Sequence, residues 1–295
     1  MMASTRIPLA VVVLTYNEER NLPACLSSVS DWVSELYVVD AGSTDQTVAI
    51  AAHHGACVVT HLFENHARQW HWALHHLPIT AEWVLGLDAD QRITPALQHE
   101  MTQLMCDKDT AEAGPAGYYL KRKQIFRGRW IKHGGYYPKY LLKLFRRSAV
   151  WVDENDLVDH HFRVQGEVGL LQHDLIEDNQ NEADISVWVA KHNRYATLQA
   201  REEMTQSDLA SRSRLRDALF GSPDQRTQWR RQLWRRLPLY LRPALYFFYR
   251  YVCRLGFLDG KEGFVFHALQ AFWYRLLVDI KVDELHQQQA DRSTS

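Results

Sequence analysis

The chain has 295 residues, of which 46% are hydrophobic and 23% charged, and its formal net charge is −1. Such a composition supplies enough apolar side chains for a core and excludes a globally disordered chain. The four cysteines form no Cys-x-x-Cys pair, which argues against a zinc site and a disulfide framework. Because the first residues also lack an apolar signal-peptide core, we expect a reducing, cytoplasmic location.

The first ninety residues alternate between apolar, strand-like runs and helical patterns. Alternation at this spacing predicts a mostly parallel sheet with right-handed crossovers, which is an α/β fold. The nearly continuous apolar character of the runs is typical of strands buried on both faces. The expected strands are 9–14, 35–39, 57–60 and 83–87, and the expected helices are 21–29, 48–54 and 66–76.

The character of the chain changes after residue 117. Residues 118–124 and 140–145 are expected to be strands on either side of a Gly- and Tyr-rich loop, and 160–164 with 169–173 to form a hairpin. A long helical pattern follows at 185–219. We therefore divide the chain into a sheet domain, 1–183, and a helical extension, 184–295, rich in aromatic residues and Arg.

Two apolar stretches in the extension, 243–255 and 263–278, bear on membrane association. Each is shorter than the roughly 20 residues that cross a bilayer, and Arg and His side chains interrupt both. This pattern favours helices lying in the membrane interface, with aromatic rings at headgroup level. The alternative is an aromatic-rich helical hairpin packed on the catalytic core.

Polar motifs follow three of the predicted strands: Thr15-Tyr-Asn-Glu18, Asp40-Ala-Gly-Ser-Thr-Asp45 and Asp88-Ala-Asp90. The carboxyl ends of parallel strands meet at one sheet edge, where such folds bind ligands. Acids gathered there require a cation or a donor-rich ligand. Taken separately, each motif also fits turn or capping chemistry. Asn17 and Asp45 favour turns and caps, and the Asp88–Asp90 pair could precede a helix that begins at Thr94-Pro95. The absence of Gly-x-Gly-x-x-Gly and Gly-Lys-Ser/Thr excludes the dinucleotide-binding and P-loop readings.

These three motifs, in this order and spacing, resemble those of the inverting glycosyltransferases of family 2, in the variant that includes lipopolysaccharide-core glucosyltransferases. The stretch 255–264, Leu-Gly-Phe-Leu-Asp-Gly-Lys-Glu-Gly-Phe, is similar to the tail of exopolysaccharide-cluster members. The resemblance implies a GT-A-type fold and a metal-dependent transfer of sugar from a nucleotide sugar, expected to be a UDP-sugar.

The resemblance also implies roles for individual residues. Asp90, helped by Asp88, would hold Mn²⁺ or Mg²⁺ against the diphosphate, and Asp88 would touch the ribose or orient the metal's water. Asp40 would accept hydrogen bonds from the base or ribose, and Arg68 would lie near the nucleotide. The residues expected around the nucleobase and ribose are Thr15, Tyr16, Asn17 and Glu18.

An inverting transferase also needs a carboxylate to deprotonate the acceptor hydroxyl. Relatives place a His-Glu pair about six residues before a Gly, and counting back from Gly166 reaches Asp159 instead of a Glu. We take Asp159 as the catalytic base, with Glu154 next and Asp153 and Asp156 as neighbouring acids. His173 is a further candidate for the metal or diphosphate, and the stretch 173–178 could complete the site.

Charge is unevenly distributed: residues 121–147 hold ten Lys or Arg and no acid. Such a block suits a polyanion. The resemblance implies a lipid-linked or polysaccharide acceptor, so we expect the enzyme to work at the cytoplasmic membrane surface and to bind no nucleic acid. Three alternatives remain: a nucleotidyltransferase using a similar carboxylate pair, a non-catalytic nucleic-acid-binding protein, and a catalytically silent scaffold. The sugar and the linkage are not encoded in these motifs.

Overall fold

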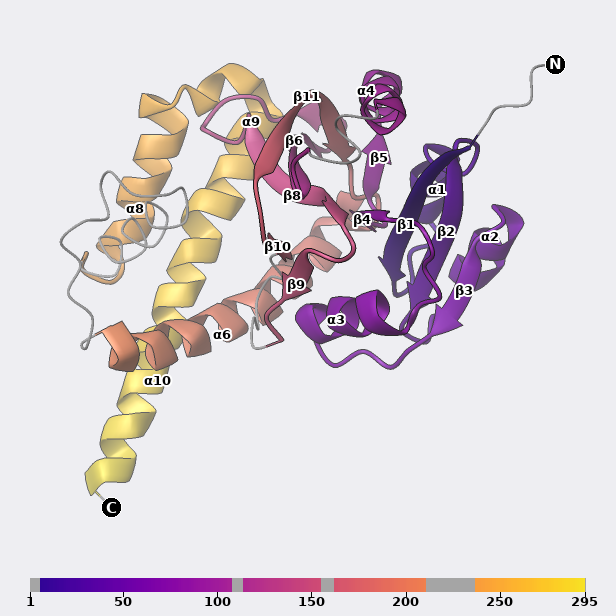
Figure 1. Ribbon diagram of the computed structural model, residues 1–295. Helices are drawn as coiled ribbons and strands as arrows, with labels where there is room; N and C mark the ends of the chain where they lie inside the picture. The colour runs from indigo at the N-terminus through magenta and orange to yellow at the C-terminus, as the bar shows by residue number, and fades with distance from the viewer. Residues whose placement is uncertain (1–5, 108–113, 155–161, 211–236, 295) are drawn as a thin grey trace. The chain divides into compact units, whose positions relative to one another are not determined.

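The computed structural model describes residues 6–107, 114–154, 162–210 and 237–294 (Figure 1). The chain forms two compact units, Met1–Ile185 and Ser186–Ser295.

The first unit is built on a nine-stranded mixed sheet. The strands of this sheet are Ile7–Thr15 (β1), Val33–Asp40 (β2), Cys57–Thr60 (β3), Trp83–Asp88 (β4), Gln91–Ile93 (β5), Gly117–Phe126 (β6), Arg129–Trp130 (β7), Lys139–Arg146 (β8) and Val168–Glu177 (β11). Their order is β3-β2-β1-β4-β8-β6-β11-β5, with β7 paired to β6. This arrangement confirms the predicted α/β class.

The four strands β3, β2, β1 and β4 are parallel, as their apolar sequences predict. The register aligns Thr15 of β1 with Asp40 of β2, and Leu14 of β1 with Asp88 of β4. The three polar motifs therefore leave the sheet at the same edge, as expected.

The other strands form a curled half of the sheet. β8 runs antiparallel to β4 and β6, β11 is parallel to β6, and β5 is antiparallel to β11. Only Ala89 and Asp90 separate β4 from β5 in the chain, although three strands separate them in the sheet. A flat sheet would hold β4 and β5 about 19 Å apart, whereas three peptide steps span at most about 11 Å. These five strands (β4, β8, β6, β11, β5) therefore curl into what we call the strand ring, which the Ala89-Asp90 corner closes.

The expected hairpin between 160–164 and 169–173 is wrong. Phe162–Val164 (β10) instead pairs antiparallel with Val150–Val152 (β9), in a separate two-stranded sheet. β11 pairs with β6, far away in the sequence, and this pairing buries Leu171 and Leu175 in the core. Local hairpin pairing would forgo that burial, which is the larger stabilising contribution.

Helices cover both faces of the parallel strands. Leu22–Ser27 (α1), Thr47–His53 (α2) and Pro95–Cys106 (α4) contribute to the core that contains Val11 and Val13. His66–His76 (α3) packs with Ala10 and Val12 on the opposite face. The α4 helix begins as its sequence predicts, since the Thr94 hydroxyl accepts a hydrogen bond from Leu97 N at 3.2 Å.

The second unit is helical, as predicted for this part of the chain. Its own core contains Ala196, Ala200, Tyr274 and Val278. No helix among the described residues combines the length and the apolar character needed to cross a membrane. Its elements are Ile185–Ala210 (α6), Leu241–Phe248 (α8), Tyr249–Cys253 (η2), Gly256–Asp259 (η3), Gly260–His267 (α9), Ala268–Trp273 (η4) and Tyr274–Thr294 (α10), with the short η1 turn, Asn181–Ala183, at the end of the first unit.

The Leu-Gly-Phe-Leu-Asp-Gly stretch at 255–260 is a tight turn between η2 and α9. A Cβ on Gly256 would lie 2.5 Å from the ring of the buried His267, so only glycine fits there. Gly260 has a φ of +71°, which favours glycine. The turn leaves Phe257 and Leu258 exposed at 45% and 49%. The motif therefore has a packing role and presents apolar side chains to solvent.

Candidate functional site

Three carboxylates meet where the strand ring closes. Asp88 ends β4, Asp90 occupies the corner before β5, and Glu177 ends β11. One oxygen from each lies within 4.8 Å of the others, and all three residues are half-buried. Carboxylate oxygens are the ligands that Mg²⁺ and Mn²⁺ prefer, so the donor set fits such an ion. The corner itself is fixed to β11, because Asp178 N donates to Asp90 O at 3.0 Å.

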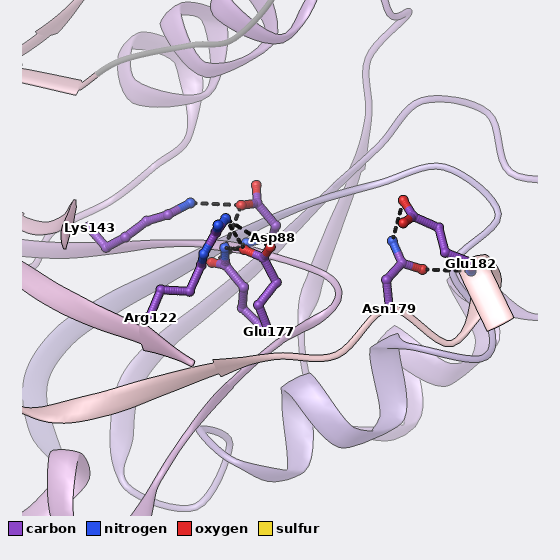
Figure 2. A network of polar contacts seen from close by, with 7 residues as sticks. Asp88, Arg122, Lys143, Glu177, Asn179 and Glu182 are labelled. Carbon is purple, nitrogen blue, oxygen red and sulfur yellow. Dashed lines mark hydrogen bonds and ion pairs between the residues drawn. The ribbon is translucent and has the colours of Figure 1, made fainter. Parts of the chain in front are cut away.

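Every strand of the strand ring contributes one polar side chain to this cluster (Figure 2). Lys143 from β8 lies with its Nζ 2.9 Å from Asp88 Oδ2, and Arg122 from β6 lies with its Nη1 2.9 Å from Glu177 Oε1. Gln91 from β5 donates through Nε2 to Asp88 Oδ2 at 2.8 Å and to Glu177 Oε2 at 3.0 Å. The Asp88 and Glu177 carboxylates are thus held by two cations and one amide.

Gln91 was not among the residues that the sequence assigned to the site. Arg122 and Lys143 were expected only as part of the basic block at 121–147, and Glu177 only as part of the stretch 173–178. One signal was available: Lys143 interrupts the apolar run of β8, and its side chain is only 6% exposed. A buried lysine requires a charge partner, so its presence in an apolar strand points to a nearby acid. The stretch 173–178, which was expected to complete the site, contains Glu177, but the sequence did not show which of its residues faces the site.

The β1 and β2 loops bind each other through Asp40. Its carboxylate accepts the Thr15 hydroxyl at 3.0 Å and, on the other oxygen, the backbone N–H groups of Gly42 at 2.9 Å and Ser43 at 2.8 Å. Asp40 is 1% exposed. Its internal role is to fix the loop, and its contact with a base or ribose stays a prediction.

Asn17 and Glu18 continue this arrangement. Asn17 has a φ of +54° and accepts the Thr44 N–H through its side chain at 2.8 Å. Glu18 Oε2 accepts hydrogen bonds from Asn21 at 2.7 Å and from Asn181 at 3.0 Å. Since Asn181 lies four residues beyond Glu177, these bonds join the β1 loop to the segment that follows β11. Tyr16 is 59% exposed, with its ring available to stack on a planar ligand.

The pKa of the buried Cys25 thiol responds to several of these carboxylates. Burial raises the pKa of the Cys25 thiol, Asp90, Asp88 and Glu18 raise it further, and Lys143 lowers it. The thiol is therefore not a nucleophile at neutral pH. Carboxylates from two of the three predicted motifs act on this one buried group, which marks a region of negative potential that attracts cations.

The other predicted site residues are not part of the carboxylate cluster or lie outside the described residues. Arg68 is half-exposed on α3 and pairs with Glu64 one turn away. His173 Nδ1 lies 2.8 Å from Glu100 Oε2, and among the described residues the group able to hold a metal does not include His173. Glu154 is half-exposed, 3.6 Å from the His71 ring. Asp159 lies outside the described residues, as does Asp156. Their predicted roles stay predictions.

Several basic side chains of the block at 121–147 have partners inside the fold. Besides Arg122 and Lys143, Lys123 lies 3.0 Å from Asp174 and Arg146 pairs with Glu82. Arg147 donates to the backbone oxygen of Ile79. These five side chains therefore have partners inside the fold, and the expected contact of the block with a polyanion stays a prediction.

Comparisons with known proteins identify the family. Residues 10–162, about half of the chain, match the profile described as Glycosyl transferase family 2. The chain is 26% identical over 286 residues to the lipopolysaccharide core biosynthesis glycosyltransferase LpsC of Rhizobium meliloti, covering 90% of this chain and 91% of that protein. It is 36% identical to an uncharacterized glycosyltransferase of Rickettsia conorii over 93 residues, 32% of each chain.

Among solved structures, S. aureus TarS (residues 1–349) matches with 15% identity and a TM-score of 0.41, over 95% of this chain and 91% of that one. Glucosyl-3-phosphoglycerate synthase from Mycobacterium tuberculosis, in complex with Mn²⁺, UDP and glucosyl-3-phosphoglycerate, matches with 23% identity and a TM-score of 0.29, over 41% and 45%. Because the family profile matches half of this chain, we conclude that the chain belongs to glycosyltransferase family 2.

Proposed function

We propose that this protein transfers a sugar, with inversion, from a nucleoside diphosphate sugar to a hydroxyl of a lipid-linked or lipopolysaccharide-type saccharide. A UDP-sugar is the expected donor. The observation that carries the proposal is the meeting of the Asp88, Asp90 and Glu177 carboxylates beside the β1 and β2 loops at one sheet edge. A metal-bound diphosphate at the carboxylates would bring its nucleoside against those loops.

In the proposed reaction, the bond between C1 of the sugar and the diphosphate breaks while the acceptor oxygen bonds to C1, and the acceptor proton passes to a carboxylate base. Asp88, Asp90 and Glu177 would hold Mn²⁺ or Mg²⁺, which supplies positive charge to the leaving diphosphate. Tyr16 and Asn17 would orient the nucleoside. Asp159 is proposed as the base and Glu154 as its alternative. The base must reach the acceptor hydroxyl, whose oxygen attacks C1 from the side opposite the diphosphate.

Family membership favours sugar transfer over the nucleotidyltransferase alternative. The β1 loop supports the same choice, since it carries Thr-Tyr-Asn-Glu in place of the Gly-rich, basic loop expected of a nucleotidyltransferase. The similarity to LpsC over nearly the full length of both chains supports an acceptor of the lipopolysaccharide-core kind.

We also propose that the second unit binds the surface of the membrane. Large apolar side chains that are 41–55% exposed follow one another from α8 to α9: Tyr240, Leu241, Leu245, Phe248, Tyr249, Val252, Leu255, Phe257, Leu258 and Phe264. Arg254 and Lys261 lie exposed among them. Exposed apolar runs with basic neighbours are the pattern of an interfacial contact with anionic lipid.

The transferase proposal is tested by nucleotide release from a panel of UDP- and GDP-sugars, with and without Mn²⁺, in the presence of lipopolysaccharide-core saccharides. We expect Mn²⁺-dependent release from at least one donor, stimulated by an acceptor. Asp90→Asn should lower the rate at least a hundredfold, because it removes one charged ligand of the ion. The proposal is wrong if no sugar nucleotide is bound or turned over, or if Asp90→Asn leaves turnover unchanged.

Membrane binding is tested separately by sedimentation of the full chain with phosphatidylglycerol-containing vesicles. We expect Phe257→Ser with Leu258→Ser to reduce the bound fraction several-fold. Leu62→Ser with Phe63→Ser, at exposed apolar positions of the first unit, is the matched control. Absence of wild-type binding, or equal losses in the two double variants, would reject the membrane proposal and leave the transferase proposal standing.

A further inference from the structure

Lys143 lies inside the strand ring, where a lysine is costly. Its neighbours along β8, Leu142 and Leu144, belong to the buried core on opposite faces of the sheet. The lysine itself is 5% exposed, and its ammonium lies 5.9 Å from the centre of the Phe162 ring. Desolvation of a charged side chain destabilises a fold unless a partner compensates for it, and the Lys143 ammonium lies 2.9 Å from Asp88 Oδ2.

Holding the carboxylates together does not require this lysine. Gln91 is fully buried and already donates to both Asp88 and Glu177. A lysine on Asp88 Oδ2 also competes with any metal ion for that oxygen. A site selected for metal binding alone would therefore be better without Lys143.

The formal charge of the cluster points to a role for Lys143 in binding an anion. Asp88, Asp90 and Glu177 with Lys143 and Arg122 carry a formal charge of −1. Without the two cations the same carboxylates would carry −3, and a divalent ion would leave a negative site facing a diphosphate. With them, the site holding a divalent ion is positive and attracts the diphosphate.

We propose that Lys143 is a binding residue for the donor diphosphate: it pairs with Asp88 in the empty site and donates to a diphosphate oxygen in the loaded site. This inference rests on the proposed function. Oxygens that share an ion at about 2.1 Å lie within about 4 Å of each other, so the ammonium beside Asp88 is within reach of a phosphate oxygen on the same ion. Arg122 keeps Glu177 in place during the exchange.

This role predicts opposite changes in two affinities when the charge is removed. Lys143→Met should bind Mn²⁺ alone more tightly, by about three- to tenfold, because the competing cation is gone. The same variant should bind UDP at saturating Mn²⁺ about tenfold or more weakly, because a charge-assisted hydrogen bond to the diphosphate is lost. A lysine with a purely structural role would give losses in both.

Both affinities can be measured on the full chain without turnover. Electron paramagnetic resonance of free Mn²⁺ gives the metal affinity, and calorimetry gives the affinity for UDP at saturating Mn²⁺. Lys123→Met is the matched control, because Lys123 pairs with Asp174 and contacts none of the three carboxylates. Lys143→Arg, which keeps the charge, should restore most of the UDP affinity.

Tighter Mn²⁺ binding together with weaker UDP binding in Lys143→Met, and neither change in Lys123→Met, supports the proposal. If the wild type binds both ligands and Lys143→Met changes neither, or weakens both equally, the proposal is wrong while the proposed function stands. If the wild type binds neither Mn²⁺ nor UDP, the proposed function fails and this inference fails with it. Should Lys143→Met not fold, Lys143→Gln keeps a hydrogen-bond donor for Asp88 without the charge, and the same outcomes decide.

Discussion

The side-chain amide of Gln91 lies 3.0 Å from the Glu177 carboxylate and joins β5 to β11 inside the strand ring. Because Gln91 also donates to Asp88, it offsets the repulsion between two carboxylates. We expect Gln91→Leu to lower the free energy of unfolding by about 2 kcal/mol, the cost of leaving buried polar groups without a partner. We also expect it to weaken Mn²⁺ binding, measured by urea denaturation and metal titration.

Gln69→Leu is the control for Gln91, because Gln69 is an equally buried amide that bonds to His61 instead. It should lose comparable stability and keep the wild-type affinity for Mn²⁺. Equal Mn²⁺ affinities in the two variants would contradict the role given to Gln91.

Glu177 is expected to be a metal ligand. Glu177→Gln should weaken Mn²⁺ binding at least tenfold, since a neutral amide replaces one of three charged oxygen donors. The measurement is a Mn²⁺ titration of the variant against Glu182→Gln, a change at a nearby acid that bonds to Asn179 (Figure 2). Wild-type Mn²⁺ affinity in Glu177→Gln would remove this residue from the site.

Gly86 lies in β4, two residues before Asp88, where a side chain would collide with the core. A Cβ there would lie 2.9 Å from the Phe162 ring and 3.1 Å from the Trp70 ring. Gly86→Ala should therefore lower the free energy of unfolding by about 1–3 kcal/mol, as overpacking does. Phe162→Leu should relieve part of that loss, so the double variant should be more stable than the sum of the single losses predicts. Urea denaturation of the wild type, the two single variants and the double variant tests this. Strictly additive losses of unfolding free energy would contradict the clash.

His267 makes the second unit sensitive to acid. Burial, followed by the charge of Arg250, lowers the pKa of His267 to about 4, with Asp259 opposing the shift. Because the folded pKa lies below the ordinary value of 6.5, the unfolded chain binds the proton first. The stability contributed by the neutral ring is complete above pH 6.5 and falls as the pH is lowered from 6.5 to about 4.

Two measurements check the behaviour of His267. Its ring resonances should titrate with a midpoint near 4 by nuclear magnetic resonance. In addition, His267→Leu should flatten the pH dependence of the unfolding free energy in that interval. A midpoint near 6.5 would contradict the buried, neutral ring.

Much of the fold could be predicted because its signals are local. The strands β1 to β4 are apolar runs, polar motifs follow β1, β2 and β4, and Thr94-Pro95 marks the start of α4. The place of Asp88 and Asp90 at the sheet edge could be predicted for the same reason, since six consecutive residues, 85–90, carry the signal. Their role as metal ligands stays a prediction. The GT-A-type sheet with a helical C-terminal region followed from the family resemblance, and the family match supports it.

The rest of the site depends on contacts between distant residues. Glu177 and Lys143 meet the Asp88 corner because β8, β6 and β11 stand in that order in the curled sheet. No local pattern encodes this order, and the preference for short hairpins pointed to the wrong partner for β11. The basic block gives a related example, because composition counts charges without showing that five of them have partners inside the fold. Its contact with a polyanion stays a prediction.

The two-residue corner that closes the strand ring has a consequence for dynamics. β4 is hydrogen-bonded to β1 on one side and to β8 on the other, and the corner ties its end to β5. The amide protons of β4 should therefore exchange with solvent mainly when the first unit unfolds as a whole. An ion bound by Asp88, Asp90 and Glu177 would bridge β4, the corner and β11, and any such ion stabilises the closed state by mass action. Binding of the ion and the donor should therefore appear in hydrogen exchange as slower opening of the entire sheet, because the ion would stabilise the fold as well as bind the substrate.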